Sequence, residues 1–297
     1  MWTEKNIGRK LLALTEGIDC VGVSLHGGGK SRMRNDRLSD RLVPMLLVLL
    51  VCFATTGTFS AAPLQQTNVV VNPPADPMAT PLRLLAEARQ SYQRVADYSC
   101  LFVKREFLEG QLQPENLIDL KVRTQPFSVY MRWLRPNQLA GQEACYVAGR
   151  NNGMMRAHTT GLVGRIGFVS IAPDDPRALQ HSRHTITEVG IGNLLEKLAR
   201  HWQLESQMNR TQVQIAAYEY DKKRCTRVET FHPESARNQV SFYRTVVYFD
   251  DATHLPIRIE NYGWPRTPGD RNGALVESYS YANLRLNLGI GEEAFNH

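Results

Sequence analysis

The feature that most constrains the fold is a repeated alternation of apolar and polar residues along the C-terminal two thirds of the chain. Segments such as LIDLKVR (117–123) and FSVYMRWL (127–134) place apolar side chains on one side of an extended chain. Gly, Asn, Asp or Pro bound most of these segments, as hairpins require. The predicted strands are 99–107, 117–123, 127–134, 143–148, 212–219, 224–231, 240–249, 256–262, 274–282 and 283–287. The alternation predicts an antiparallel sheet with one packed and one wetter face.

Two segments change to helical spacing. Thr80 and Pro81 are expected to start the first helix, as a hydroxyl cap followed by proline at the first helical position, and the helix is expected to end near Asp97. The second follows TITEVGIGNLLEKLARHWQ (185–203), with Thr187 as its expected cap. Their apolar positions are Leu84, Leu85, Ala88, Tyr92 and Val95, then Ile191, Leu194, Leu195, Leu198 and Trp202. The predicted fold class is α+β, with both helices packed on the apolar face of the sheet.

The residues before the first helix have the pattern of an export leader. MLLVLLVCF (45–53) is a short apolar run behind several arginines and ahead of small residues, as in a secretory signal peptide. It is too short to span a membrane, which needs roughly 20 apolar residues. We expect a leader over 1–62, with a true start possible at Met33, a Pro-rich linker over 63–80 and a single domain over 81–297.

Charge and cysteine content exclude some classes of function. Residues 61–297 hold 27 Lys and Arg against 24 Asp and Glu, too small an excess to indicate nucleic-acid binding. Cys100, Cys145 and Cys225 lie beyond the leader, so at most one disulfide forms within this part of the chain. A Cys145–Cys225 pair is conceivable in an oxidising compartment, but the sequence cannot choose a pair. Buried structural cysteines, rather than a catalytic thiol, are the default expectation.

Adjacent carboxylates occur in VYFDDATHLPIRIENY (247–262), where Asp250 and Asp251 precede His254. General acid–base catalysis needs two groups that converge on a substrate. Neighbouring residues of a strand point to opposite faces instead, and Asp is favoured in turns because it accepts bonds from backbone amides. We therefore interpret this stretch as the tip of a hairpin.

A cluster of histidines and acids is the best candidate metal site. Its residues are His158, Asp174, Asp175, His181, His184 and Glu188. Imidazole and carboxylate ligands suit zinc, but no HExxH pattern occurs, and HSRH (181–184) has the composition of a solvated loop. The sequence therefore predicts no metal, no cofactor and no catalytic residue.

Residues 82–297 resemble a secreted bacterial family known as domain of unknown function 1571. The matching segments are YSCLFVKRE, MRWLRP, ITEVGIGNLLEKL, YFDDATHLPIRIENY and YSYANLRLNLGIGEEAFN. The last two also resemble lipoprotein carriers of the LolA/LolB-like fold. This second resemblance implies a strongly curved antiparallel sheet, a half-barrel, wrapped around the N-terminal helix.

The carrier-like resemblance further implies an apolar concavity suited to an acyl chain or hydrophobic peptide. Its expected lining is Leu85, Tyr92, Phe127, Val129, Met131 and Trp133. The alternative is that these side chains fill an ordinary core, because every packed sheet needs such a face.

We expect an exported, periplasmic or extracytoplasmic protein that binds a hydrophobic ligand or lipoprotein and is not an enzyme. No nucleic acid and no stable membrane span after signal removal are expected. One alternative is an envelope sensor or scaffold that binds another protein. A further alternative is a metal-dependent hydrolase that uses His158, His181 and His184.

Overall fold

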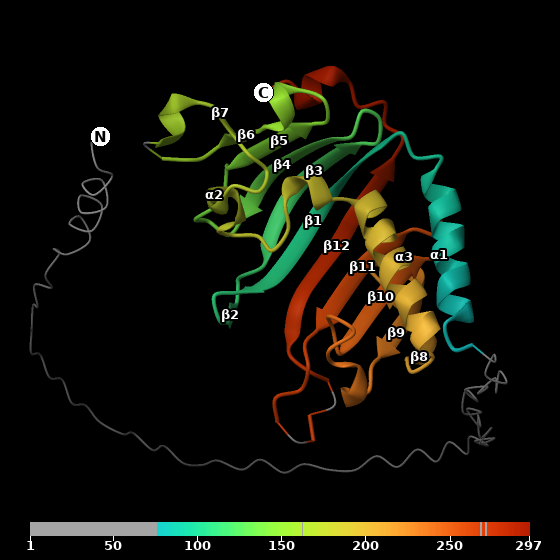
Figure 1. The fold of residues 1–297 in the computed structure, drawn as a ribbon. Helices are drawn as coiled ribbons and strands as arrows, with labels where there is room; N and C mark the ends of the chain where they lie inside the picture. The colour runs from blue at the N-terminus through green and yellow to red at the C-terminus, as the bar shows by residue number, and fades with distance from the viewer. Residues whose placement is uncertain (1–75, 162, 268, 271) are drawn as a thin grey trace, which may run out of the picture. The chain divides into compact units, whose positions relative to one another are not determined.

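The computed structural model describes residues 76–297 except 162, 268 and 271, and these residues form an antiparallel sheet of twelve strands that does not close on itself (Figure 1). The predicted leader and most of the linker lie outside the described residues. The strands are β1 Asp97–Leu108, β2 Gln111–Leu112, β3 Asn116–Arg123, β4 Ser128–Arg135, β5 Glu143–Val147, β6 Met155–His158, β7 Val169–Ile171, β8 Gln212–Tyr220, β9 Lys223–Phe231, β10 Arg244–Asp250, β11 Pro256–Tyr262 and β12 Leu275–Leu286. Their order is β7-β6-β5-β4-β3-β1-β12-β11-β10-β9-β8, with β2 paired to β1 alone.

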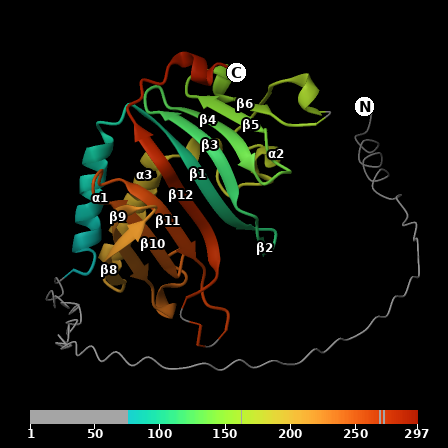
Figure 2. The ribbon, with the colours of Figure 1, turned by 180° about the vertical axis from the view of Figure 1, so that it is seen from behind.

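The helices are α1 Ala79–Tyr92, α2 Pro176–Leu179 and α3 Ile191–Met208. Short 3-10 turns lie at η1 Asn151–Gly153, η2 Val163–Ile166, η3 Ile186–Glu188, η4 Glu234–Ala236 and η5 Glu292–Phe295. Helices α1 and α3 lie side by side on one face, which we call the inner face, and the sheet bends around α3 (Figures 1 and 2). The α+β class, with an N-terminal and an inserted helix on an antiparallel sheet, is confirmed. None of the described helices is long and apolar enough to cross a membrane.

The inner face carries the main hydrophobic core. In β3, Ile118, Leu120 and Val122 are fully buried, as their alternation predicts. Helix α3 packs onto this face with its predicted apolar stripe, and the ring of Trp202 lies 6.1 Å from that of Phe249 on β10. Burial of this stripe, rather than helix propensity, therefore holds α3 in place.

The start of α3 is fixed by a strand rather than by its own sequence. The N-cap is Gly190, which has no capping side chain, and the hydroxyl of Tyr98 on β1 accepts from the backbone N–H of Ile191 at 2.8 Å. Gly190 has φ +108°, and a Cβ there would lie 2.7 Å from that hydroxyl. The predicted cap Thr187 is wrong: Thr185 and Glu188 form a capping box around η3 instead.

The first helix begins two residues earlier than its sequence predicts. Its N-cap is Met78, whose N–H donates to the carboxylate of Asp76 at 2.8 Å, so Thr80 lies inside the helix and does not cap it. Met78 is also buried in the core. The anchoring of this apolar residue extends the helix beyond the Thr-Pro signal. The helix ends at Tyr92, short of Asp97, where β1 already begins.

Several short elements of the fold were not predicted. Strands β2, β6 and β7 and helix α2 are two to four residues long, too short for a periodic pattern. The predicted strand over 240–249 begins only at Arg244, and the two predicted C-terminal strands form the single strand β12.

The outer face of the sheet is covered in part by the C-terminus. Phe295 of η5 packs with Tyr130, Cys145 and Val147 of β4 and β5 in a hydrophobic cluster separate from the main core. Both faces of β4 are therefore buried near its start. This explains why Tyr130 is buried, although it lies opposite the apolar side on which Val129 and Met131 project.

Candidate functional site

A cavity of about 450 Å³ lies on the inner face between α3 and strands β1, β11 and β12. Its apolar lining includes Phe102, Met131, Leu194, Leu198, Ile259 and Tyr281. Ionisable side chains from these strands, from the segment before α3 and from α3 itself also line it. The inner face is therefore neither a wholly filled core nor a wholly apolar slot.

Of the six residues predicted to line a concavity, Met131 contributes to this cavity. Leu85 and Val129 are buried in the main hydrophobic cluster, while Phe127, Tyr92 and Trp133 pack against that cluster. The indole N–H of Trp133 donates to the side-chain oxygen of Asn116 at 3.0 Å.

The polar wall begins with a buried ion pair on β1. The ammonium group of Lys104 lies 3.1 Å from a carboxylate oxygen of Glu106, and both side chains are about 95% shielded from solvent. Lys104 also donates to the carbonyl of His181 and to the hydroxyl of Ser182, each at 3.0 Å. The backbone N–H of Arg183 donates to Glu106 at 3.2 Å. Both charges on β1 therefore hold the segment 181–190, which we call the strap.

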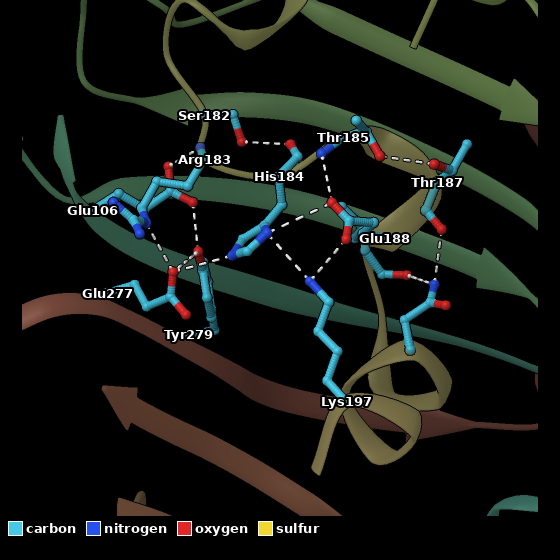
Figure 3. Close-up of polar contacts among 12 residues, drawn as sticks. Glu106, Ser182, Arg183, His184, Thr185, Thr187, Glu188, Lys197, Glu277 and Tyr279 are labelled. Carbon is cyan, nitrogen blue, oxygen red and sulfur yellow. Dashed lines mark hydrogen bonds and ion pairs between the residues drawn. The ribbon is translucent and has the colours of Figure 1, made fainter. Parts of the chain in front are cut away.

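A second anchor for the strap comes from β12 (Figure 3). Glu277 is buried and accepts from the guanidinium of Arg183 and from His184 Nε2, both at 3.0 Å, and from the amide of Asn261 at 2.8 Å. The hydroxyl of Tyr279 donates to Glu106 at 2.6 Å and thereby connects the two anchors. The carboxylates of two adjacent central strands thus bind the neighbouring strap residues Arg183 and His184.

His184 links the strap to α3. The ammonium group of Lys197 lies 3.2 Å from His184 Nδ1 and 3.1 Å from a carboxylate oxygen of Glu188 (Figure 3). His184 Nε2 faces Glu277 on β12, and His184 Nδ1 faces Lys197 on α3. The imidazole therefore bridges β12 and α3.

Burial and pairing shift the pKa values of this network in opposite directions. Burial alone would raise the pKa of Glu277, but the hydrogen bond and charge of His184, the hydrogen bond from Asn261 and the charge of Arg183 outweigh it and lower the pKa to about 2. Burial lowers the pKa of Lys104, and Glu106 opposes that shift. The pKa of Tyr279 is raised by burial and by the charges of Glu277 and Glu106. At neutral pH Glu277 is therefore ionised and Tyr279 is a proton donor.

The sequence predicted a strand over 99–107 but did not predict that its charged residues face the core. From Cys100 onward, the buried residues of β1 are Cys100, Phe102, Lys104 and Glu106. The available signal was that Lys104 and Glu106 continue the two-residue spacing of Phe102. Charges on the core-facing side of a central strand are unusual and mark a polar site.

The candidate metal ligands do not converge. Among the described residues, no group of three His, Cys, Asp or Glu side chains is arranged to hold a metal ion. His158 Nε2 lies 3.1 Å from the carbonyl of Gly164, and Asp175 caps α2 and pairs with Arg177. The interpretation of residues 181–184 as a solvated loop is wrong for the backbone of Arg183 and the ring of His184, because buried carboxylates hold them in place.

The two adjacent aspartates form a hairpin tip, as predicted. Asp250 is buried and accepts from the N–H of Ala252 at 3.0 Å and the hydroxyl of Thr253 at 3.1 Å. Asp251 is exposed and accepts from Thr226 at 2.9 Å. His254 has φ +60°, as a turn residue does. The carboxylates face apart, which confirms the turn interpretation.

The three described cysteines are buried, which confirms that expectation, and they are unpaired. Burial raises the pKa of all three thiols, that of Cys145 to about 11. Since the thiolate is the nucleophile, a thiol that stays protonated at neutral pH is a poor catalyst.

Comparison with known proteins identifies a family. The family model described as "Protein of unknown function (DUF1571)" matches residues 95–297 of this chain. None of the curated proteins compared with the chain matches it significantly.

Solved structures share the general arrangement at low similarity. An uncharacterized conserved protein from Thermus thermophilus is 8% identical, with a TM-score of 0.42 over 73% of this chain and 93% of that chain. The MucA/MucB complex of Pseudomonas aeruginosa is 12% identical, with a TM-score of 0.40 over 74% of this chain and 61% of that chain. A LolA superfamily protein from Nitrosomonas europaea is 11% identical, with a TM-score of 0.30 over 73% of this chain and 97% of that chain. Likenesses this distant leave the function to be argued from the residues of the chain itself.

Proposed function

This chain belongs to the DUF1571 family, and we propose that it is an extracytoplasmic, non-enzymatic binding protein that holds a hydrophobic ligand in the inner-face cavity. The ligand classes are a lipoprotein acyl chain, a lipid or an apolar peptide segment. The observation that carries the proposal is the cavity of about 450 Å³, which remains open although α3 packs on the same face. Ligand pockets in proteins have volumes of roughly 300–1,000 Å³.

The apolar part of the cavity supplies the binding free energy. Phe102, Leu194, Leu198 and Ile259 come from three elements and face the same space. Each methylene buried there contributes about 0.8 kcal/mol, so a chain of about six methylenes gains about 5 kcal/mol.

The chemistry of the wall supports binding rather than catalysis. Glu277, Glu106 and His184 are engaged in the contacts that hold the strap. The thiols are buried, with raised pKa values. Export is supported by the leader pattern of residues 45–53 with the basic residues ahead of it.

Binding of the uncharged apolar probe N-phenyl-1-naphthylamine tests the proposal. We expect its fluorescence to rise on binding and Leu198→Trp, which fills the cavity, to weaken binding at least about tenfold, or about 1.4 kcal/mol. Gln203→Trp is the matched control, because it adds the same ring on an exposed position of the same helix. If Leu198→Trp does not fold, Val276→Phe at the half-buried side of the cavity replaces it.

Native mass spectrometry of the protein purified from its own envelope supplies a second readout. We expect an apolar adduct on the unmodified protein and less of it on Leu198→Trp. A protein that carries no adduct and binds the probe no better than its cavity-filled variant contradicts the proposal.

A further inference from the structure

One end of the sheet is an unprotected edge. Strand β8 has nine residues and is the last strand of the sheet, with β9 as its one partner strand among the described residues. Ile215 is 44% exposed and Tyr218 is 49% exposed, on opposite faces of the strand. The other end of the sheet is β7, which has three residues. A very short edge strand is one way in which proteins prevent edge pairing, and β8 lacks this protection.

The composition of β8 does not protect its edge from pairing either. QVQIAAYEY contains one charged residue, Glu219, and neither lysine, arginine nor proline. Strand edges that must stay unpaired usually carry inward charges, proline or a bulge. The pairing of β8 with β9 runs without a register shift from Gln212 to Tyr220. The edge is therefore long, regular and almost uncharged.

The hairpin geometry shows which peptide groups are available. The turn between β8 and β9 consists of Asp221 and Lys222, both with positive φ, so the flanking pair Tyr220 and Lys223 exchanges both hydrogen bonds. Toward the N-terminus of β8, every second residue counted from Tyr220 exchanges hydrogen bonds with β9 in the same way. The residues between these direct their backbone N–H and C=O groups away from β9, toward the open edge. These outward residues in the middle of the strand are Val213, Ile215 and Ala217.

We propose that this edge pairs with the β8 edge of a second copy of the chain, antiparallel, around a twofold axis at Ile215. In this register Ile215 faces the second copy's Ile215, and Val213 faces the second copy's Ala217. The three outward residues of each copy then form about six intermolecular hydrogen bonds. The exposed isoleucine becomes buried against its symmetry mate, as expected of an isologous contact.

The charges favour this register. Glu219 lies opposite the second copy's Thr211 and Arg210 lies opposite the second copy's Tyr220, so each of these charged side chains faces an uncharged residue. No like charges face each other along the strand. A shift of the axis to Ala217 would instead place Glu219 against the second copy's Ile215, which would desolvate a carboxylate against an apolar side chain.

Disulfide cross-linking tests both the partner and the register. Residues directly opposite in such a pair have Cα atoms about 5.5 Å apart, within the range that a disulfide spans. The protein as the cell produces it is compared with its Ile215→Cys and Gln214→Cys variants under mild oxidation. We expect Ile215→Cys to form a covalent dimer and Gln214→Cys to remain unlinked, because residue 214 faces residue 216 of the second copy. Cys100, Cys145 and Cys225 are buried and do not compete.

Sedimentation equilibrium supplies the matching measurement without a covalent bond. We expect the unmodified protein to dimerise and Ile215→Lys, which places two ammonium groups on the axis, to raise the dissociation constant at least about tenfold. Gln214→Lys is the control and should dimerise nearly as well. A monomer at all concentrations, a dimer insensitive to Ile215→Lys, or equal cross-linking of both cysteine variants overturns the proposal.

Discussion

Replacement of Glu277 by glutamine should remove a defined part of the acid sensitivity of this protein. The carboxylate is 5% exposed and accepts from Arg183, His184 and Asn261. Glutamine has the same shape but no charge, so Glu277→Gln isolates the contribution of the ionised form. The effect should depend on pH because the pKa of Glu277 differs between the folded and unfolded chains.

The magnitude follows from that difference. The pKa is 4.5 for the free group and about 2 in the folded protein. Since the folded value is lower, ionised Glu277 stabilises the fold above about pH 4.5, and this stabilisation is lost as the pH falls toward 2. At 1.36 kcal/mol for each pKa unit, the contribution at pH 7 is about 3 kcal/mol.

Urea denaturation of the two proteins at pH 7, 4 and 3 measures the difference. We expect Glu277→Gln to lower the free energy of unfolding by about 3 kcal/mol at pH 7 and by progressively less at lower pH. Glu115→Gln, an exposed position before β3, is the control and should change little at any pH. If the difference in the free energy of unfolding between Glu277→Gln and the unmodified protein stays constant from pH 7 to pH 3, the assigned role of Glu277 is refuted.

Three further substitutions probe the rest of the described fold, each by urea or thermal denaturation. Lys104→Met should cost about 3–5 kcal/mol, because it leaves the buried Glu106 without its cation. The double variant Lys104→Met, Glu106→Leu should recover most of that loss. If the double variant is as unstable as Lys104→Met alone, the unpaired charge of Glu106 is not the cause of the loss. Gly190→Ala should lower the stability by at least about 2 kcal/mol, because φ is +108° and the new Cβ meets the hydroxyl of Tyr98, which holds the start of α3. Asp250→Ala should cost about 1–3 kcal/mol through its lost turn contacts, with unchanged probe binding as the check that its role is structural.

The parts of the fold that the sequence predicted are those set by local periodicity. Ile118, Leu120 and Val122 alternate without interruption, and the strand over them lies within one residue of its predicted bounds. The apolar stripe of α3 was likewise complete in the sequence. Failures occurred where a distant group decides the local structure. Tyr98 determines where α3 starts, and its partner Ile191 is 93 positions away.

The candidate site was less predictable than the fold. Met131, one of the six residues expected to line a concavity, lies on a regular apolar face and contributes to the cavity. Lys104, Glu106 and Glu277 were missed because charged residues are usually assigned to the solvent side. Local spacing cannot show that β1 and β12 are neighbours in the sheet, because more than 160 residues separate them in the chain. Their adjacency brings Glu106 and Glu277 under one strap.

The position of these charges has a consequence for the cavity. Buried ion pairs contribute little net stability, because the desolvation of both charges offsets their attraction. An apolar pair at Lys104 and Glu106 would stabilise the sheet about as well, but it would offer nothing to the carbonyl of His181 or the N–H of Arg183. The charges instead define where the strap lies. Since the strap forms one wall of the cavity, the ion pairs on β1 and β12 determine the shape of the space available to a ligand.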